Sequence, residues 1–136
     1  MPHFSERSRQ RLLTCDDRLV VVCSDAIRWF DFSVIYGHRS NEEQDALYAQ
    51  GRTEPGNIVT NLRGGQSIHN TDPSRAVDLA PYVPGRGVVW DDVGLFHELY
   101  GVILCCASQR GIEIEWGGHW TRFVDRPHFQ VPPRED

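Results

Sequence analysis

The alternation of apolar and polar residues at the start of the chain predicts helix followed by strand. Up to about position 30 the apolar residues recur at helical spacing, with a break near positions 14–17. An aspartate within this break, Asp16 or Asp17, can cap the helical run 19–30. Positions 32–36 then form a short run rich in aromatic and β-branched residues, which is typical of a β-strand.

The clearest local signal along the chain is a helix start at Ser40. Glu43 follows three positions later, which is the capping-box pattern in which side chains and backbone N–H groups bond reciprocally. Gly51 is expected to end this helix. Positions 52–70 are rich in Gly, Asn, Thr and Pro and predict a long loop. Loops of this length in compact domains tend to be functional or mobile.

The second half of the chain mixes short strands with one long helix. Three apolar segments predict strands, at 76–80, 112–116 and 128–131. Pro81 is expected to end the first strand. Between the first and second strands, apolar spacing predicts a helix that Asp91 or Asp92 caps and Gly111 ends. Because helices and strands do not alternate regularly, we expect an α+β domain with a small antiparallel sheet.

Composition and charge narrow the class of protein. A chain of 136 residues is long enough for one hydrophobic core, and no repeat or linker divides it, so we expect a single domain over 1–136. The net charge of −5 offers no broad attraction to nucleic acid or to an anionic membrane. No apolar run is long enough to cross a bilayer, and the first residues lack the pattern of a signal peptide. We therefore expect no nucleic-acid partner, no membrane insertion and no signal peptide.

The 4 cysteines are expected to be free, buried thiols in a reducing compartment. Cys105 and Cys106 are adjacent and cannot bond to each other. No C-x-x-C pair is present, so a cysteine-based zinc site is not expected.

Two histidines and two aspartates are candidates for chemistry. His69 lies in the long loop, and Asp78 lies on a predicted strand. Asp125 and His128 come just before the last strand. Two imidazoles and one carboxylate are the ligand set of many catalytic zinc sites, and a second carboxylate nearby can act as a base. From spacing alone, ordinary surface or core roles for these residues stay open, and Asp78 could equally point into solvent.

Several segments of the chain resemble the zinc D,D-peptidase family. Four of them occur in the family's order: Ser67-Ile68-His69, Ala76-Val77-Asp78, Glu115-Trp116-Gly117-Gly118 and Asp125-Arg126-Pro127-His128-Phe129. The segment Gly37-His38-Arg39-Ser40 also resembles the family's strand-to-helix connection, so the similarity spans roughly residues 33–131. The family includes D-alanyl-D-alanine dipeptidases and carboxypeptidases, and phage endolysins that cut between L-alanine and D-glutamate.

The resemblance implies a role for individual residues. His69, Asp78 and His128 would hold one zinc ion per chain. Asp125 would be the general base, and Arg39 would bind or polarise the scissile carbonyl oxygen. Three further residues would contact the substrate: Ser67, Trp116 and Gln44. The ordinary alternatives, a turn cap for Ser67 and a core position for Trp116, stay open.

The chain departs from the commonest family pattern in two places. His69 and Asp78 are two residues further apart than is usual, so the segment 70–74 is expected to loop outward for both ligands to converge. Pro73 makes a turn in this segment plausible. His119 stands where many relatives have Asp, and we expect it beside the ligands or at the surface rather than on the metal.

The resemblance implies a zinc-dependent peptidoglycan peptidase of phage or prophage origin. The expected fold is a single hedgehog/D,D-peptidase-like domain with an antiparallel sheet flanked by helices and no separate cell-wall-binding domain. The expected substrate is the stem peptide, cut at the L-alanyl-D-glutamate bond. The enzyme is expected to be a monomer that reaches the cell wall from the host cytoplasm with a holin-like partner.

Three alternatives remain open at this stage. The first is a D-alanyl-D-alanine carboxypeptidase of the same family. The second is a catalytically inactive, zinc-containing wall-binding module, since the hedgehog signalling domain shares a similar zinc fold and acts mainly as a ligand. The third, a non-haem iron oxygenase, is disfavoured by the nine-residue gap between His69 and Asp78 and by the helices.

Overall fold

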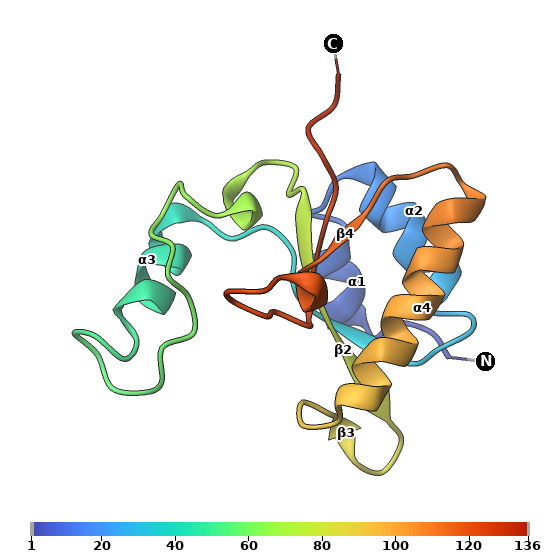
Figure 1. Ribbon diagram of the computed structural model, residues 1–136, viewed down its shortest axis with the longest axis horizontal. Helices are drawn as coiled ribbons and strands as arrows, with labels where there is room; N and C mark the ends of the chain where they lie inside the picture. Colours follow the sequence, from blue (N-terminus) through green and yellow to red (C-terminus); the bar gives the residue numbers. More distant parts are fainter. Residues whose placement is uncertain (1, 136) are drawn as a thin grey trace.

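The computed structural model describes residues 2–135, which form four α-helices and one five-stranded antiparallel sheet (Figure 1). The α-helices are α1 (Glu6–Leu12), α2 (Asp17–Ala26), α3 (Asn41–Ala49) and α4 (Val93–Gln109). The strands are β1 (Phe32–Tyr36), β2 (Ala76–Val83), β3 (Gly87–Val88), β4 (Glu115–Trp116) and β5 (His128–Gln130). Two 3₁₀ helices, η1 (Ile68–Asn70) and η2 (Gly117–His119), complete the elements. The predicted α+β class is confirmed.

The sheet runs in the order β1-β2-β5-β4, and β3 pairs with β2 at one end. In Figure 1, α1, α2 and α4 lie to one side of β2, whereas α3 and its following loop project to the other side. The hydrophobic core includes Leu19, Leu79, Leu99, Ile103 and Phe129, all fully buried. Core residues therefore come from α2, α4 and the central strands, which anchors the middle of the sheet.

The predicted helix starts are confirmed because local polar groups satisfy the first backbone N–H groups. Asp16 caps α2 by accepting from the Arg18 backbone N–H at 2.9 Å. Ser40 caps α3, and both bonds of the capping box with Glu43 form at 3.0 Å. These caps depend on residues two or three positions apart, so the sequence alone indicates them, and the structure selects Asp16 over Asp17 as the cap of α2.

Three strands have bounds that differ from the prediction. β2 does not end at Pro81 but continues to Val83, because Pro81 pairs with Phe32 in the neighbouring strand and its carbonyl accepts the Val89 N–H at 2.9 Å. The segment 112–116 contributes only two residues to β4. Its first residue instead bonds back to the end of α4. The strand expected at 128–131 is observed at 128–130.

The segment 70–74 only partly loops outward. Asp72 and Pro73 are exposed, but Ser74 is fully buried. Ser74 donates its N–H to the Thr14 carbonyl at 3.0 Å and accepts the Asp16 N–H at 2.8 Å. The longer spacing is therefore accommodated by a contact with the corner between α1 and α2, which fixes the start of β2.

All four cysteines are free thiols, as predicted. Cys15, Cys23 and Cys106 are buried, whereas Cys105 is exposed, so the expected burial is wrong for Cys105. Burial raises the pKa of Cys15 to about 12, which keeps this thiol protonated and unreactive at neutral pH. Among residues 2–135, no helix combines the length and apolar character needed to span a membrane.

We expect Asp16→Ala to lower the free energy of unfolding at pH 7 by about 1–2 kcal/mol, because the α2 cap is lost. Hydrogen bonds from Arg18, and the charge of Arg134, lower the pKa of Asp16 to about 2. The carboxylate therefore stabilises the fold fully above the unfolded-state pKa of about 3.9. This contribution is lost as the pH falls through about 2. Urea unfolding of both proteins at several pH values measures the difference.

The exposed neighbour Asp17 provides the control for this prediction. Asp17→Ala removes a charge from the same helix turn but no cap, so its effect should be smaller. The difference in free energy of unfolding between Asp16→Ala and the unmodified chain should shrink at the lowest pH. If it stayed the same, the Asp16 carboxylate would not be its source.

Candidate metal centre

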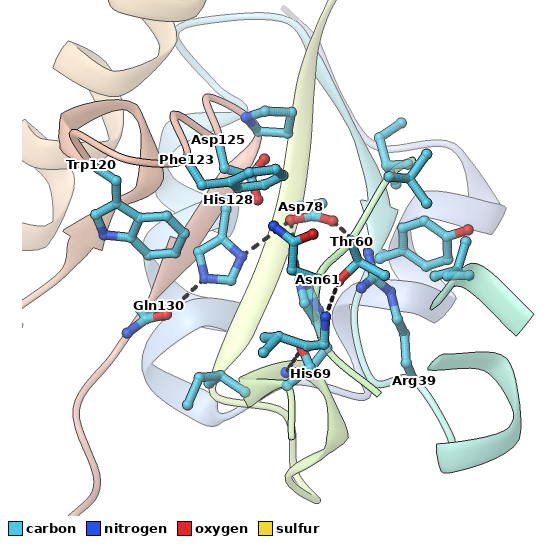
Figure 2. Close-up of a pocket in the computed structure, with 18 of the residues that line it drawn as sticks. Arg39, Thr60, Asn61, His69, Asp78, Trp120, Phe123, Asp125, His128 and Gln130 are labelled. Atoms are coloured by element: carbon cyan, nitrogen blue, oxygen red, sulfur yellow. Dashed lines mark hydrogen bonds and ion pairs between the residues drawn. The ribbon is translucent and has the colours of Figure 1, made fainter. Parts of the chain in front are cut away.

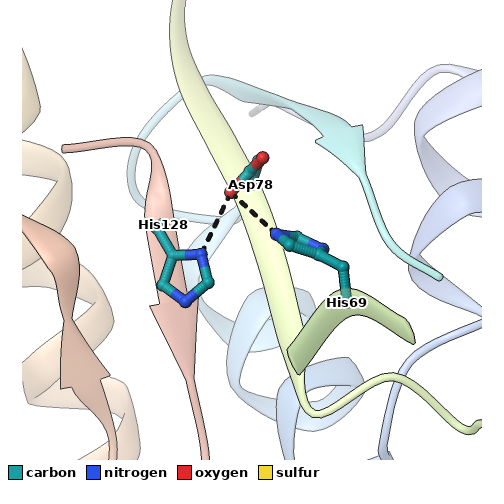
Figure 3. A group of neighbouring side chains, drawn as sticks. All are labelled: His69, Asp78 and His128. Atoms are coloured by element: carbon teal, nitrogen blue, oxygen red, sulfur yellow. Dashed lines mark hydrogen bonds and ion pairs between the residues drawn. The ribbon is translucent and has the colours of Figure 1, made fainter. Parts of the chain in front are cut away.

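Three chemistry-bearing side chains converge from three different elements (Figure 3). Asp78 on β2 and His128 on β5 are direct partners in the antiparallel register, which places them side by side. His69 comes from η1, whose start is fixed by the Ser67 hydroxyl accepting the His69 N–H at 3.2 Å. Sheet pairing and one capped turn therefore bring the three residues to the same place.

The distances within this cluster suit a single ion. Asp78 Oδ1 lies 3.2 Å from His69 Nε2 and 3.5 Å from His128 Nδ1. One potential ligand atom from each residue lies within 4.8 Å of the other two. Both histidines are buried and Asp78 is nearly so. The group could therefore hold a metal ion.

The hydrogen bond on the far side of His69 supports a cation in this cluster. His69 Nδ1 lies 2.9 Å from the Gly37 carbonyl oxygen, which can only accept, so Nδ1 carries the proton. In the neutral ring, Nε2 then turns its lone pair toward Asp78 Oδ1. Two facing acceptors repel unless a proton or a metal ion lies between them. The donor set and its orientation therefore fit a divalent metal ion.

The same cluster shifts the pKa values of its members. Burial alone would raise the pKa of Asp78, but the adjacent His69 and His128 outweigh it and hold the pKa well below its usual range. Burial alone would lower the pKa of His128, but its bond to Asp78 outweighs this and raises the pKa. Asp78 is therefore a carboxylate at neutral pH, the form that binds metal.

Arg39 contacts the other oxygen of Asp78. Its guanidinium NH2 group donates to Asp78 Oδ2 at 2.9 Å and its NH1 group donates to Gln44 Oε1 at 3.2 Å. The guanidinium also lies over the Tyr36 ring, 4.1 Å from its centroid. Arg39 therefore fixes the carboxylate so that Oδ1 faces both histidines. Arg39 also lines the pocket described below.

Asp125 reaches the cluster on a loop that needs glycine. The Asp125 N–H donates to the Gly117 carbonyl at 2.9 Å, and a Cβ at Gly117 would lie 2.3 Å from the Asp125 carbonyl oxygen. Only glycine allows this approach, so Gly117 of the motif positions Asp125. Burial and the charge of Asp78 raise the pKa of Asp125, although His128, His69 and Arg39 oppose them. A raised pKa suits a group that must accept and release a proton.

A pocket of about 720 Å³ opens onto the cluster (Figure 2). Arg39, His69, Asp78, Asp125 and His128 all line it. The rest of its lining is largely apolar, and two loops contribute to it, with Val59 and Leu62 from one and Trp120 and Phe123 from the other. The volume and mixed lining are typical of a ligand site.

The predicted substrate-contacting residues have different placements. Ser67 lines the pocket. Gln44 and Trp116 do not reach the pocket: Gln44 is fully buried and Trp116 is 2% exposed. Gln44 bonds Arg39, Thr60 and Leu62, and Trp116 stacks on Tyr100 with centroids 4.4 Å apart. The structure thus corrects the prediction for these two residues, which support the walls of the pocket.

The sequence marked the loop 52–70 as functional or mobile but did not single out its residues 59–62, and it did not identify Trp120 or Gln130; all of these line the pocket. Gln130 could have been found from strand alternation, because it lies two positions after His128 on the same face. No local pattern marked Trp120. His119 is exposed and contacts Trp116 edge-on, with centroids 5.0 Å apart, which agrees with the expected position outside the ligand set.

The family model of phage L-alanyl-D-glutamate peptidases matches residues 1–129. The chain belongs to this family. It is 38% identical over 110 residues to the peptidoglycan L-alanyl-D-glutamate endopeptidase CwlK of Bacillus subtilis (strain 168). This match covers 79% of the chain and 65% of CwlK, so the chain spans just under two thirds of that relative's length.

A solved structure is also similar to this family member. The crystal structure of the L-Ala D-Glu endopeptidase ChiX from Serratia marcescens superposes with a TM-score of 0.74 at 28% sequence identity. The match covers 96% of this chain and 91% of ChiX. The predicted D,D-peptidase-like fold and the predicted family are therefore confirmed.

Proposed function

We propose that the chain is a zinc-dependent peptidase that hydrolyses the L-alanyl-D-glutamate bond in the stem peptide of peptidoglycan. The observation that carries this proposal is the His69–Asp78–His128 cluster, which shares one pocket with the partly buried Asp125. The family and the activities named for CwlK and ChiX support the choice of bond.

His69 Nε2, Asp78 Oδ1 and His128 Nδ1 are the proposed ligand atoms for one zinc ion. Zinc bound in such a site polarises a carbonyl group and lowers the pKa of a water molecule. The preference for zinc rests on the ligand set, since two imidazoles and one carboxylate are common in catalytic zinc sites.

Asp125 is the proposed general base. It takes a proton from the attacking water, and it returns a proton to the amine nitrogen of D-glutamate as the carbon–nitrogen bond breaks. Arg39 fixes Asp78 and, because it lines the same pocket, is proposed to stabilise the negative charge that develops on the carbonyl oxygen. Ser67 is proposed to contact the substrate at the pocket wall.

Mass spectrometry of fragments released from purified peptidoglycan, with and without a zinc chelator, tests this function. Chelator-sensitive release of fragments with a new N-terminal D-glutamate is the expected result. Loss of a single D-alanine would instead establish a D-alanyl-D-alanine carboxypeptidase. No release by the zinc-loaded chain would favour a wall-binding module without activity.

We further propose that the enzyme acts as a monomeric phage lysin that reaches the cell wall with a holin-like partner. The description of the matching family as phage peptidases supports this role. Co-expression in a bacterium tests it. Lysis that requires both the chain and a membrane pore-forming holin is expected. Lysis by the chain alone would contradict the need for a holin.

A further inference from the structure

Strand β5 presents two polar side chains to the pocket. His128 and Gln130 both line the pocket, whereas Phe129 between them is fully buried in the core. This is the alternation that a β-strand imposes, and it places Gln130 beside the His128 ring. Gln130 Oε1 lies 2.7 Å from His128 Nε2, and Figure 2 shows this bond on the side of the ring away from Asp78.

The bond decides which nitrogen of His128 is free to bind metal. A neutral imidazole carries one proton, and an amide oxygen at Nε2 keeps the proton on that nitrogen. The lone pair is then on Nδ1, which lies 3.5 Å from Asp78 Oδ1. With the proton on Nδ1 instead, His128 would present a donor, and no ligand, to the ion.

Asp78 Oδ1 faces Nδ1 from the position of the proposed ion, so the contacts on the Nε2 side of the ring decide the form that binds metal. Trp120 packs against the His128 ring with centroids 4.9 Å apart, and its own indole N–H is held by Glu115 at 2.8 Å. This contact restricts the position of the ring but presents no acceptor to either nitrogen. For His69 the Gly37 carbonyl makes the equivalent choice at 2.9 Å, and a backbone group cannot be replaced by mutation.

We infer that Gln130 is a positioning residue for the metal centre, which holds His128 in the Nε2-protonated form so that Nδ1 can bind the ion. The inference rests on the proposed metal-binding function. It predicts that Gln130 acts on metal affinity even in the absence of substrate, because acceptors beyond a histidine ligand orient the ring and increase its basicity.

The test measures Zn²⁺ affinity of the metal-free full chain by competition with a chromophoric chelator. Gln130→Met removes the acceptor and keeps the side-chain length, and we expect about 10–100-fold weaker Zn²⁺ binding. Gln130→Glu keeps an acceptor and should retain the affinity of the unmodified chain. Gln10→Met, at an exposed position on α1, is the matched control and should leave the affinity unchanged.

A second measurement separates positioning from a general effect on stability. Nitrogen-15 NMR of the zinc-loaded chain should show His128 protonated at Nε2 and bound through Nδ1 in the unmodified protein and in Gln130→Glu. Gln130→Met should show a mixture of the two ring forms. If Gln130→Met acted only by loosening the fold, its free energy of unfolding would fall while the ring form stayed the same.

Each contrary result has a distinct meaning. Equal Zn²⁺ affinity of Gln130→Met and the unmodified chain would overturn this inference and leave the proposed function intact. Equal loss in Gln130→Glu and Gln130→Met would show that the amide does not act as an acceptor, which also overturns it. Failure of the unmodified chain to bind Zn²⁺ would overturn the proposed function and this inference together.

Discussion

Replacing Asp125 with Asn is expected to lower kcat for stem-peptide cleavage by about 10²–10⁴-fold while Zn²⁺ binding persists. Asparagine keeps the size of the side chain but cannot take a proton from water. Because Asp125 is not among the three clustered ligand atoms, the metal should remain bound. Initial rates on purified stem peptide, together with the zinc content of the purified variant, measure both effects.

Asp72→Asn is the matched control for this prediction. Asp72 is exposed in the segment between His69 and Asp78, so the same chemical change there should leave kcat unchanged. If Asp125→Asn retained full activity with zinc bound, another group would have to act as the base. If it lost zinc as well as activity, Asp125 would have to be counted among the groups that hold the ion.

Removing the carboxylate of Asp78 is expected to affect both metal binding and stability. Asp78→Ala deletes one proposed ligand and leaves the buried guanidinium of Arg39 without its ion-pair partner. We expect no measurable Zn²⁺ binding. In the metal-free proteins, the free energy of unfolding at pH 7 should fall by about 3–5 kcal/mol, because an uncompensated buried charge remains. Urea unfolding and chelator competition measure the two effects.

The double variant Asp78→Ala with Arg39→Met separates the loss of the proposed ligand from the effect of the unpaired Arg39 charge. Methionine removes the charge that Asp78→Ala leaves unpaired, so the double variant should be more stable than Asp78→Ala while Zn²⁺ binding remains absent. Equal stability of the Asp78→Ala variant and the unmodified chain would show that the Arg39–Asp78 pair does not stabilise the fold.

Interactions between residues close in sequence could be predicted from the chain alone. The cap at Ser40 depends on Glu43, three residues away, and the α2 cap at Asp16 acts on Arg18, two residues away. The order of the short motifs also identified the family and the three clustered residues. Such signals survive without tertiary context because the groups involved are held near each other by the chain itself.

Predictions failed where a partner distant in sequence decides the outcome. Pro81 usually ends a strand, but here pairing with Phe32 and a bond from Val89 carry β2 onward. The segment 70–74 was expected to loop outward throughout, yet Ser74 is buried against the α1–α2 corner. Neither contact can be seen in the residues beside it.

The sequence by itself therefore determined the helix starts, the mixture of helices and strands, the family, and the candidate ligands and base. The tertiary structure decided how these groups act on one another. Pairing of β2 with β5 places Asp78 opposite His128, and the buried Gln44 of α3 bonds the Arg39 side chain that contacts the carboxylate. The bond between Gln130 and His128 also depends on folding, because only an extended strand holds side chains two positions apart on the same face. The physical reason is that ligand identity is a property of single residues, whereas orientation, burial and protonation depend on neighbours that only the fold supplies.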